Sequence, residues 1–118
     1  MIAYAEAVLD LMDRLPVDRD ENLERLAHTH TYGHILELIE DGELKGYGEV
    51  FRLKSVPVYP VIPWPKDDPE GKFLYCFSAV CEKGYIRKLI ELGKKTFPEC
   101  DIIYHREKKN HQLVRIYV

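Results

Sequence analysis

The sequence predicts an α+β fold in which N-terminal helices precede a mixed, mostly antiparallel sheet with one βαβ crossover. Three observations support this class. Residues 73–80 are almost unbroken apolar sequence, which is typical of a central strand covered on both faces. Residues 86–97 have the apolar spacing of an amphipathic helix, and residues 102–104 are again apolar. A strand, a helix and a strand in this order predict two parallel strands joined by a crossover helix.

Size and charge limit the classes of protein to which the chain can belong. A length of 118 residues predicts one domain, residues 1–118, and an apolar share of 46% is enough for a hydrophobic core. The formal net charge of −3 argues against a nucleic-acid partner. Residues 1–43 carry −8, which leaves +5 for the rest. No apolar run approaches membrane length, so no membrane association is expected.

The three cysteines are an odd set without the CxxC spacing of a metal site. They are Cys76, Cys81 and Cys100. This pattern predicts reduced thiols and an intracellular protein.

The first 43 residues are predicted to be mainly helical. Residues 2–15 place apolar side chains on one stripe. A second helix begins at Asp18, which has capping-box spacing, and its pattern weakens over residues 28–33. Thr31 is suited to cap a third helix, which would end at Gly42.

Residues 44–56 predict a strand that carries a single carboxylate on one of its faces. Tyr47 and Phe51 share this face, and Glu49 lies between them. A solvated edge position and a catalytic role are both open for Glu49.

The second half of the chain completes the sheet. Gly93 lies on the apolar face of the helix at residues 86–97, which predicts a close approach of that helix to the sheet. The helix should end before Pro98. Residues 112–118 predict a last strand that forms an antiparallel hairpin with the strand before it.

Residues 57–71 hold five prolines among apolar residues. This composition predicts a stiff, extended segment rather than a flexible linker. Its Tyr59 and Trp64 either form a recognition surface or pack onto the core or a subunit contact, and both interpretations are open.

The run FLYCFSAVCEKGYIRKLIELGKKTFPECDIIYH, with helices before it, resembles the GNAT acyltransferase fold over residues 31–106. It is most similar to short variants encoded by phages and prophages. In GNAT enzymes the turn after this strand is R/Q-x-x-G-x-G/A, and its N–H groups hold the pyrophosphate of acetyl-CoA. The matching turn here, residues 81–86, has only Gly84 and also contains Glu82, so the acetyl-CoA loop is degenerate.

The resemblance implies two alternative functions. The first is a phage- or prophage-type accessory or virion-associated protein that keeps the fold and acts by protein binding or self-association. It would need no cofactor, would use Tyr59 and Trp64, and would reside in the host cytoplasm or the virion. The second is a non-classical CoA-dependent N-acyltransferase, which takes acetyl-CoA or another acyl-CoA. Its base would be Glu49 or His105, and its cofactor-binding residues would be Lys83, Gly84, Tyr85 and Arg87.

Two other groups of residues are weaker candidates for a metal or catalytic site. His28, His30 and His34 suggest a metal, but three ligands cannot share one face of an unbroken helix at this spacing. We therefore expect surface or capping histidines and no metal. Cys81 with His105 is a possible nucleophilic pair, but no orienting Asp or Asn stands at a recognisable spacing.

Overall fold

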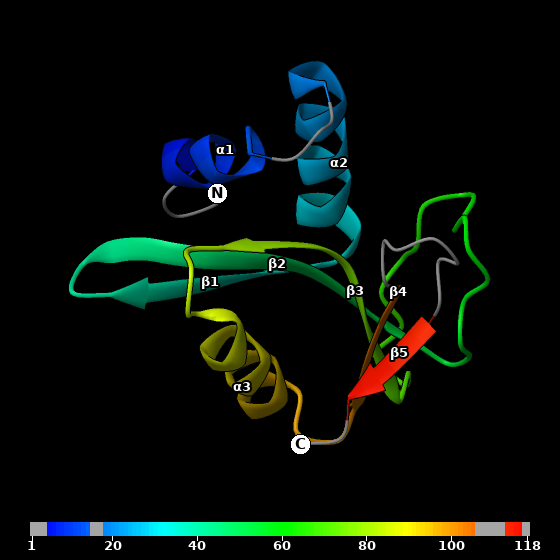
Figure 1. Ribbon diagram of the computed structural model, residues 1–118. Helices are drawn as coiled ribbons and strands as arrows, with labels where there is room; N and C mark the ends of the chain where they lie inside the picture. Colours follow the sequence, from blue (N-terminus) through cyan, green and yellow to red (C-terminus); the bar gives the residue numbers. More distant parts are fainter. Residues whose placement is uncertain (1–4, 15–17, 106–112, 117–118) are drawn as a thin grey trace.

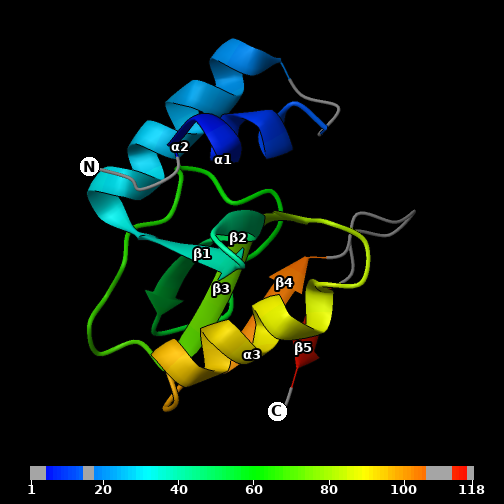
Figure 2. The same ribbon diagram turned by 90° about the vertical axis from the view of Figure 1, so that its left-hand side faces the viewer.

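A five-stranded sheet separates two helices on one face from a third helix on the other (Figures 1 and 2). The computed structural model describes residues 5–14, 18–105 and 113–116. This arrangement confirms the predicted α+β class. In chain order the elements are α1 (Ala5–Met12), α2 (Arg19–Tyr32), β1 (His34–Glu40), β2 (Glu43–Leu53), β3 (Phe73–Cys81), α3 (Ile86–Thr96), β4 (Asp101–His105) and β5 (Leu113–Ile116).

The strands lie side by side in chain order, from β1 to β5. β3 and β4 are parallel and are joined by α3, as the βαβ prediction requires. The other neighbouring pairs are antiparallel, including β4 with β5. The turn of the C-terminal hairpin, residues 106–112, lies outside the described residues. Among the described residues, no helix has the length and apolar character needed to cross a bilayer.

The prediction of a third helix beginning near Thr31 is wrong, because residues 34–40 form β1. Asp41 and Gly42 have positive φ angles of 55° and 77° and connect β1 to β2 as a two-residue hairpin turn. Asp-Gly between apolar runs favours this turn, since both central residues must adopt positive φ. The spacing of the apolar residues in 35–39 fits both the helical and the strand period, and pairing with β2 stabilises the strand.

The two N-terminal helices agree with the sequence only in part. α1 ends at Met12, before the predicted end at residue 15, and residues 1–4 and 15–17 lie outside the described residues. Asp18 caps α2, its carboxylate accepting from the Asp20 N–H at 3.2 Å. The predicted weakening over residues 28–33 is wrong, because α2 continues to Tyr32. Thr29 is tolerated in that last turn because its hydroxyl has a buried partner on β2.

Each face of the sheet has its own hydrophobic core. The core on the α3 face contains Leu36, Val50, Leu74, Leu89, Cys100 and Ile102. The core on the face of α1 and α2 contains Val8, Leu11, Met12, Leu26 and Tyr47. The helices thus cover both faces of β2 and β3, as the continuous apolar run of β3 predicts.

Gly93 lies where α3 approaches the sheet, in agreement with the prediction, but the space admits a methyl group. A Cβ at this position would lie 3.5 Å from both Leu36 Cδ1 and Ile102 Cδ1, an ordinary contact. Gly93→Ala should therefore raise the free energy of unfolding by about 0.5–1 kcal/mol through helix propensity. Gly93→Leu should lower it by about 1–3 kcal/mol through overpacking. Urea unfolding of the two variants checks both signs, and a destabilised alanine variant would contradict the packing described.

Candidate functional site

β3 and β4 run together for only part of the length of β3. Residues 73–76 of β3 pair with residues 101–104 of β4, whereas β3 continues along β2 to Cys81. In Figure 1, β4 stays at the right of the sheet while β3 extends to the left toward α3. Within the described part of the chain, no strand pairs with this side of residues 77–81, which we call the free edge of β3.

A β-bulge marks the point of separation. Val50 of β2 pairs with Cys76 and Glu49 pairs with Ser78, so Phe77 is the extra residue on β3. The bulge shifts the alternation of side chains. Cys76 and Ala79, three residues apart, therefore both pack against the core on the α3 face. Bulges of this kind re-aim side chains and end pairing next to functional sites.

The backbone N–H and C=O groups of the free edge that face away from β2 point into the gap between β3 and β4. The Glu82 N–H donates to the Lys45 carbonyl of β2 at 2.7 Å. Successive residues of a strand direct their backbone groups to alternate sides. Ala79 and Cys81 thus present their N–H and C=O groups away from β2.

The free edge leads directly into the first turn of α3. Gly84 has a φ of +89°, and nothing lies within 4 Å of the position that a Cβ would take. Tyr85 occupies the N-cap without a side-chain hydrogen bond to the helix, and the first turn contains no acidic residue. The first N–H groups of a helix lack partners within the helix, and the helix dipole favours an anion there.

Two of the cationic side chains around this turn have no ion-pair partner among the described residues. Arg14 donates to both Glu82 oxygens, at 2.9 and 3.1 Å, and this hydrogen bonding lowers the pKa of Glu82. Lys88 is paired in the same way, with Glu40 at 2.6 Å. Lys83 and Arg87 are exposed, and no described carboxylate lies within salt-bridge distance of either.

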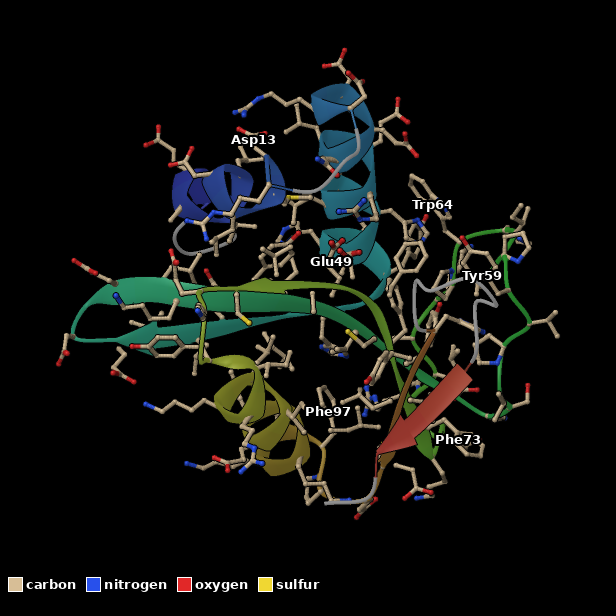
Figure 3. The ribbon with its side chains drawn as sticks, in the orientation of Figure 1. Asp13, Glu49, Tyr59, Trp64, Phe73 and Phe97 are labelled. Atoms are coloured by element: carbon tan, nitrogen blue, oxygen red, sulfur yellow. The ribbon has the colours of Figure 1, made fainter. Side chains whose placement is uncertain are left out.

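Glu49 lies in the interior, so a solvated edge position is wrong. Its side chain is 0% exposed and points from β2 toward α2 (Figure 3). Arg25 Nε donates to Oε2 at 3.1 Å, and the Thr29 hydroxyl donates to Oε1 at 2.8 Å. Burial, with the Glu49 charge as the second cause, raises the pKa of Tyr47 to about 12. Sequence reasoning missed Arg25 and Thr29, whose i, i+4 spacing in α2 is the only signal for them.

His105 ends β4 at the level of the bulge. Its Nδ1 lies 2.9 Å from the Tyr75 hydroxyl, and its ring centroid lies 5.3 Å from that of Tyr59. Burial raises the pKa of Tyr75 to about 12, which keeps the hydroxyl protonated. Cys81 is not brought to His105, because it stands five residues beyond the last pair of β3 and β4, about 16 Å of strand. Burial also raises the pKa of the Cys81 thiol, which disfavours a nucleophilic thiolate.

The proline-rich segment packs onto the molecule with its tryptophan directed inward. Trp64 is half-buried, with ring contacts to His28 at 5.3 Å and Phe77 at 6.1 Å (Figure 3). Tyr59 is 41% exposed, and Val58 and Ile62 are 83% and 80% exposed. The segment therefore combines both open interpretations: it covers part of the core and exposes apolar side chains at its outer end.

The three histidines that lie close together in the sequence have different surroundings in the structure. His28 Nε2 bonds to the Pro65 carbonyl at 2.6 Å, and His34 Nε2 lies 3.2 Å from Asp67 Oδ2. His30 is exposed on α2. Over the described ranges, no three His, Cys, Asp or Glu side chains are grouped so as to hold a metal ion. All three cysteines are free thiols.

Comparison with solved structures supports the fold. The chain is similar to a structure described as "GphF GNAT-like decarboxylase in complex with isobutyryl-CoA", with a TM-score of 0.53 and 14% sequence identity. The likeness covers 84% of this chain and 59% of that one. At this identity it shows the fold alone, which is GNAT-like, as predicted. No protein-family model matches the sequence, and no curated protein matches it.

Proposed function

We propose that this protein binds a CoA thioester, with the pantetheine arm along the free edge of β3 and the pyrophosphate at the first turn of α3. The observation that carries this proposal is the separation of the two strands, since β3 continues for five residues beyond its last pair with β4. The similar solved structure, described as a complex with isobutyryl-CoA, supports the same ligand class on this fold.

The free edge offers the backbone groups that an extended arm requires. Pantetheine contains two amides, and the outward N–H and C=O groups of Ala79 and Cys81 can pair with them as a strand would. The pantetheine arm would thus pair with residues 77–81 in place of a neighbouring strand, where β4 no longer pairs with β3.

The first turn of α3 offers the features that suit a pyrophosphate. Gly84 leaves the approach open, and the orphan N–H groups of the helix start favour an anion. Lys83 and Arg87 supply two positive charges, and Tyr85 lies at the N-cap between them. The negative charge of Glu82, which departs from the GNAT pattern, is offset by Arg14.

An acyl-transfer reaction at this site would depend on His105 rather than Glu49. His105 lies at the bulge, where the thioester end of the arm would be. Glu49 has both carboxylate oxygens engaged and has no exposed surface. We therefore assign the proton-accepting role to His105 and a structural role to Glu49.

Isothermal titration of the protein with CoA tests the proposal. Lys83→Ala with Arg87→Ala should weaken binding by about tenfold or more, which corresponds to about 1.4 kcal/mol. The matched control, Lys72→Ala with Lys95→Ala, removes two other exposed charges and should change the affinity little. Absence of binding at millimolar CoA would contradict the function. Binding that ignores the Lys83 and Arg87 changes would contradict the proposed location.

A second candidate function is protein binding through the outer end of the proline-rich segment. The exposure of Val58 and Ile62 favours it, whereas Trp64 is turned toward the core. A phage or prophage accessory role, in the virion or host cytoplasm, stays a prediction of the resemblance. If this surface mediates self-association, Val58→Ser with Ile62→Ser should abolish concentration-dependent sedimentation without lowering the melting temperature. Trp64→Ala should instead destabilise the fold by about 1–3 kcal/mol.

A further inference from the structure

The direction of the bound arm fixes where its acyl group would lie, if the proposed CoA site is correct. With the pyrophosphate next to Gly84, the arm runs from Cys81 toward Phe77. These four steps of a strand span about 13 Å, which suits the extended pantetheine arm. The thioester therefore ends at the bulge, beside Phe77.

The acyl group cannot continue in the plane of the sheet or turn toward α3. In the plane, β4 closes the way, because Cys76 already pairs with Tyr104. On the α3 face, Cys76 and Ala79 are packed against the hydrophobic core together with Ile90 and Leu92 of the helix. The remaining direction is the face that carries α1, α2 and the proline-rich segment.

On that face the thioester would meet a continuous set of rings, which we call the aromatic surface. Its members are Tyr59, Trp64, Tyr75, Phe77 and His105. Phe77 lies 6.1 Å from Trp64 and 6.2 Å from Tyr75 between ring centroids. His105 lies 5.5 Å from Tyr75 and 5.3 Å from Tyr59. Phe77, Trp64 and His105 are half-buried, so each ring keeps part of its surface accessible.

The chemistry of the aromatic surface favours an apolar ligand. Contact between an aromatic ring face and an apolar group is favourable, and its free energy grows with the apolar area removed from water. A carboxylate placed against these rings would lose hydration, and none of the described Lys or Arg side chains is in ring contact with the aromatic surface to compensate it.

We propose that the bound thioester carries an apolar acyl group larger than acetyl, branched or aromatic, which packs on the aromatic surface. This rests on the proposed CoA site. Tyr59 and Trp64 come from the proline-rich segment, so this inference assigns that segment a role in acyl selection. The prolines restrict its conformation, and the two rings are held ready before the ligand arrives.

Titration with CoA, acetyl-CoA, isobutyryl-CoA, benzoyl-CoA and succinyl-CoA tests the inference. Isobutyryl-CoA and benzoyl-CoA should bind at least about tenfold more tightly than acetyl-CoA, and tenfold corresponds to about 1.4 kcal/mol. Succinyl-CoA should bind more weakly than acetyl-CoA. Tight CoA binding with equal affinity for all thioesters would overturn this inference and leave the CoA site intact. No binding of CoA or of any thioester would overturn both.

Two variants locate the selectivity. Phe77→Ala should reduce the preference for isobutyryl-CoA over acetyl-CoA, measured as the ratio of the two affinities so that any effect common to both ligands cancels. Tyr59→Ala, at a position that is 41% exposed, tests the same surface with less risk to folding, and Val58→Ala is its control in the same segment. A preference that survives both ring variants would overturn the role of the aromatic surface.

Discussion

Replacing Arg25 with alanine is expected to lower the free energy of unfolding by about 3–5 kcal/mol. Arg25 supplies the counter-charge of Glu49, whose side chain is 0% exposed. Without it, a carboxylate would be left in the interior, with the Thr29 hydroxyl as its remaining hydrogen-bond donor among the described side chains. An uncompensated buried charge destabilises the fold by more than the ion pair itself stabilises it, because the protein interior does not replace the lost hydration of the carboxylate.

Urea unfolding of Arg25→Ala measures this effect against two comparisons. Arg19 forms an exposed pair with Asp13, so Arg19→Ala should cost only about 0–1 kcal/mol. Arg25→Met with Glu49→Gln removes both charges and should recover much of the stability lost in Arg25→Ala. Equal effects of the Arg25 and Arg19 changes would show that Glu49 does not depend on a buried partner.

Replacing Asp67 with asparagine is expected to cost about 2–3 kcal/mol at neutral pH. Asp67 ties the proline-rich segment to β2: Oδ1 accepts from the Arg52 N–H at 2.7 Å, and Oδ2 accepts from Arg52 Nη2 at 2.6 Å. His34 Nε2 lies 3.2 Å from Oδ2, and the Asp67 N–H donates to the Tyr32 carbonyl at 2.7 Å. An amide can accept only part of these bonds and provides no charge for the guanidinium.

The contribution of Asp67 should depend on pH with a defined sign. Burial raises the pKa of Asp67, but hydrogen bonds from Arg52 and His34 outweigh it, and the folded-state pKa lies below the ordinary 3.8. The stabilisation is thus present above 3.8 and is lost as the pH falls through the folded-state pKa. The stability difference between wild type and Asp67→Asn should be present above about pH 4 and shrink below it.

Thermal unfolding across this pH range checks the prediction, with Glu70→Gln as the control. Glu70 pairs with Lys54 at 3.3 Å and is exposed, so its replacement should have little effect at any pH. A difference for Asp67→Asn that grows as the pH falls below about 4 would contradict the assigned pairing with Arg52.

Local sequence patterns were sufficient for the central part of the fold. The apolar run of β3, the amphipathic spacing of α3 and the short run of β4 predict the βαβ unit, because each period is expressed within one segment. β1 was assigned to a helix because Ile35, Leu38 and Ile39 fit the helical period, whereas the strand is selected by its pairing with β2. Such non-local pairing leaves no trace in the spacing of a seven-residue segment.

The candidate site depends on relations that the sequence does not contain. Glu49 was recognisable as an unusual carboxylate, but its burial follows from the helix that brings Arg25 and Thr29 over it. The bulge at Phe77 breaks the alternation on β3, and the end of its pairing with β4 defines the free edge. The Gly84 turn with the basic residues around it, and the side chains of His105, Tyr59 and Trp64, could be named in advance, but not the way in which the fold groups them.

Amide hydrogen exchange with and without isobutyryl-CoA tests the central claim most directly. The backbone amides of Ala79 and Cys81 point into the separation between β3 and β4, where the pantetheine arm is proposed to pair. Saturating ligand should slow exchange at these two amides and at the first turn of α3. The amides of Val80 and Glu82, which face β2, should change little. Protection elsewhere, with unchanged exchange at Ala79 and Cys81, would contradict the proposed site.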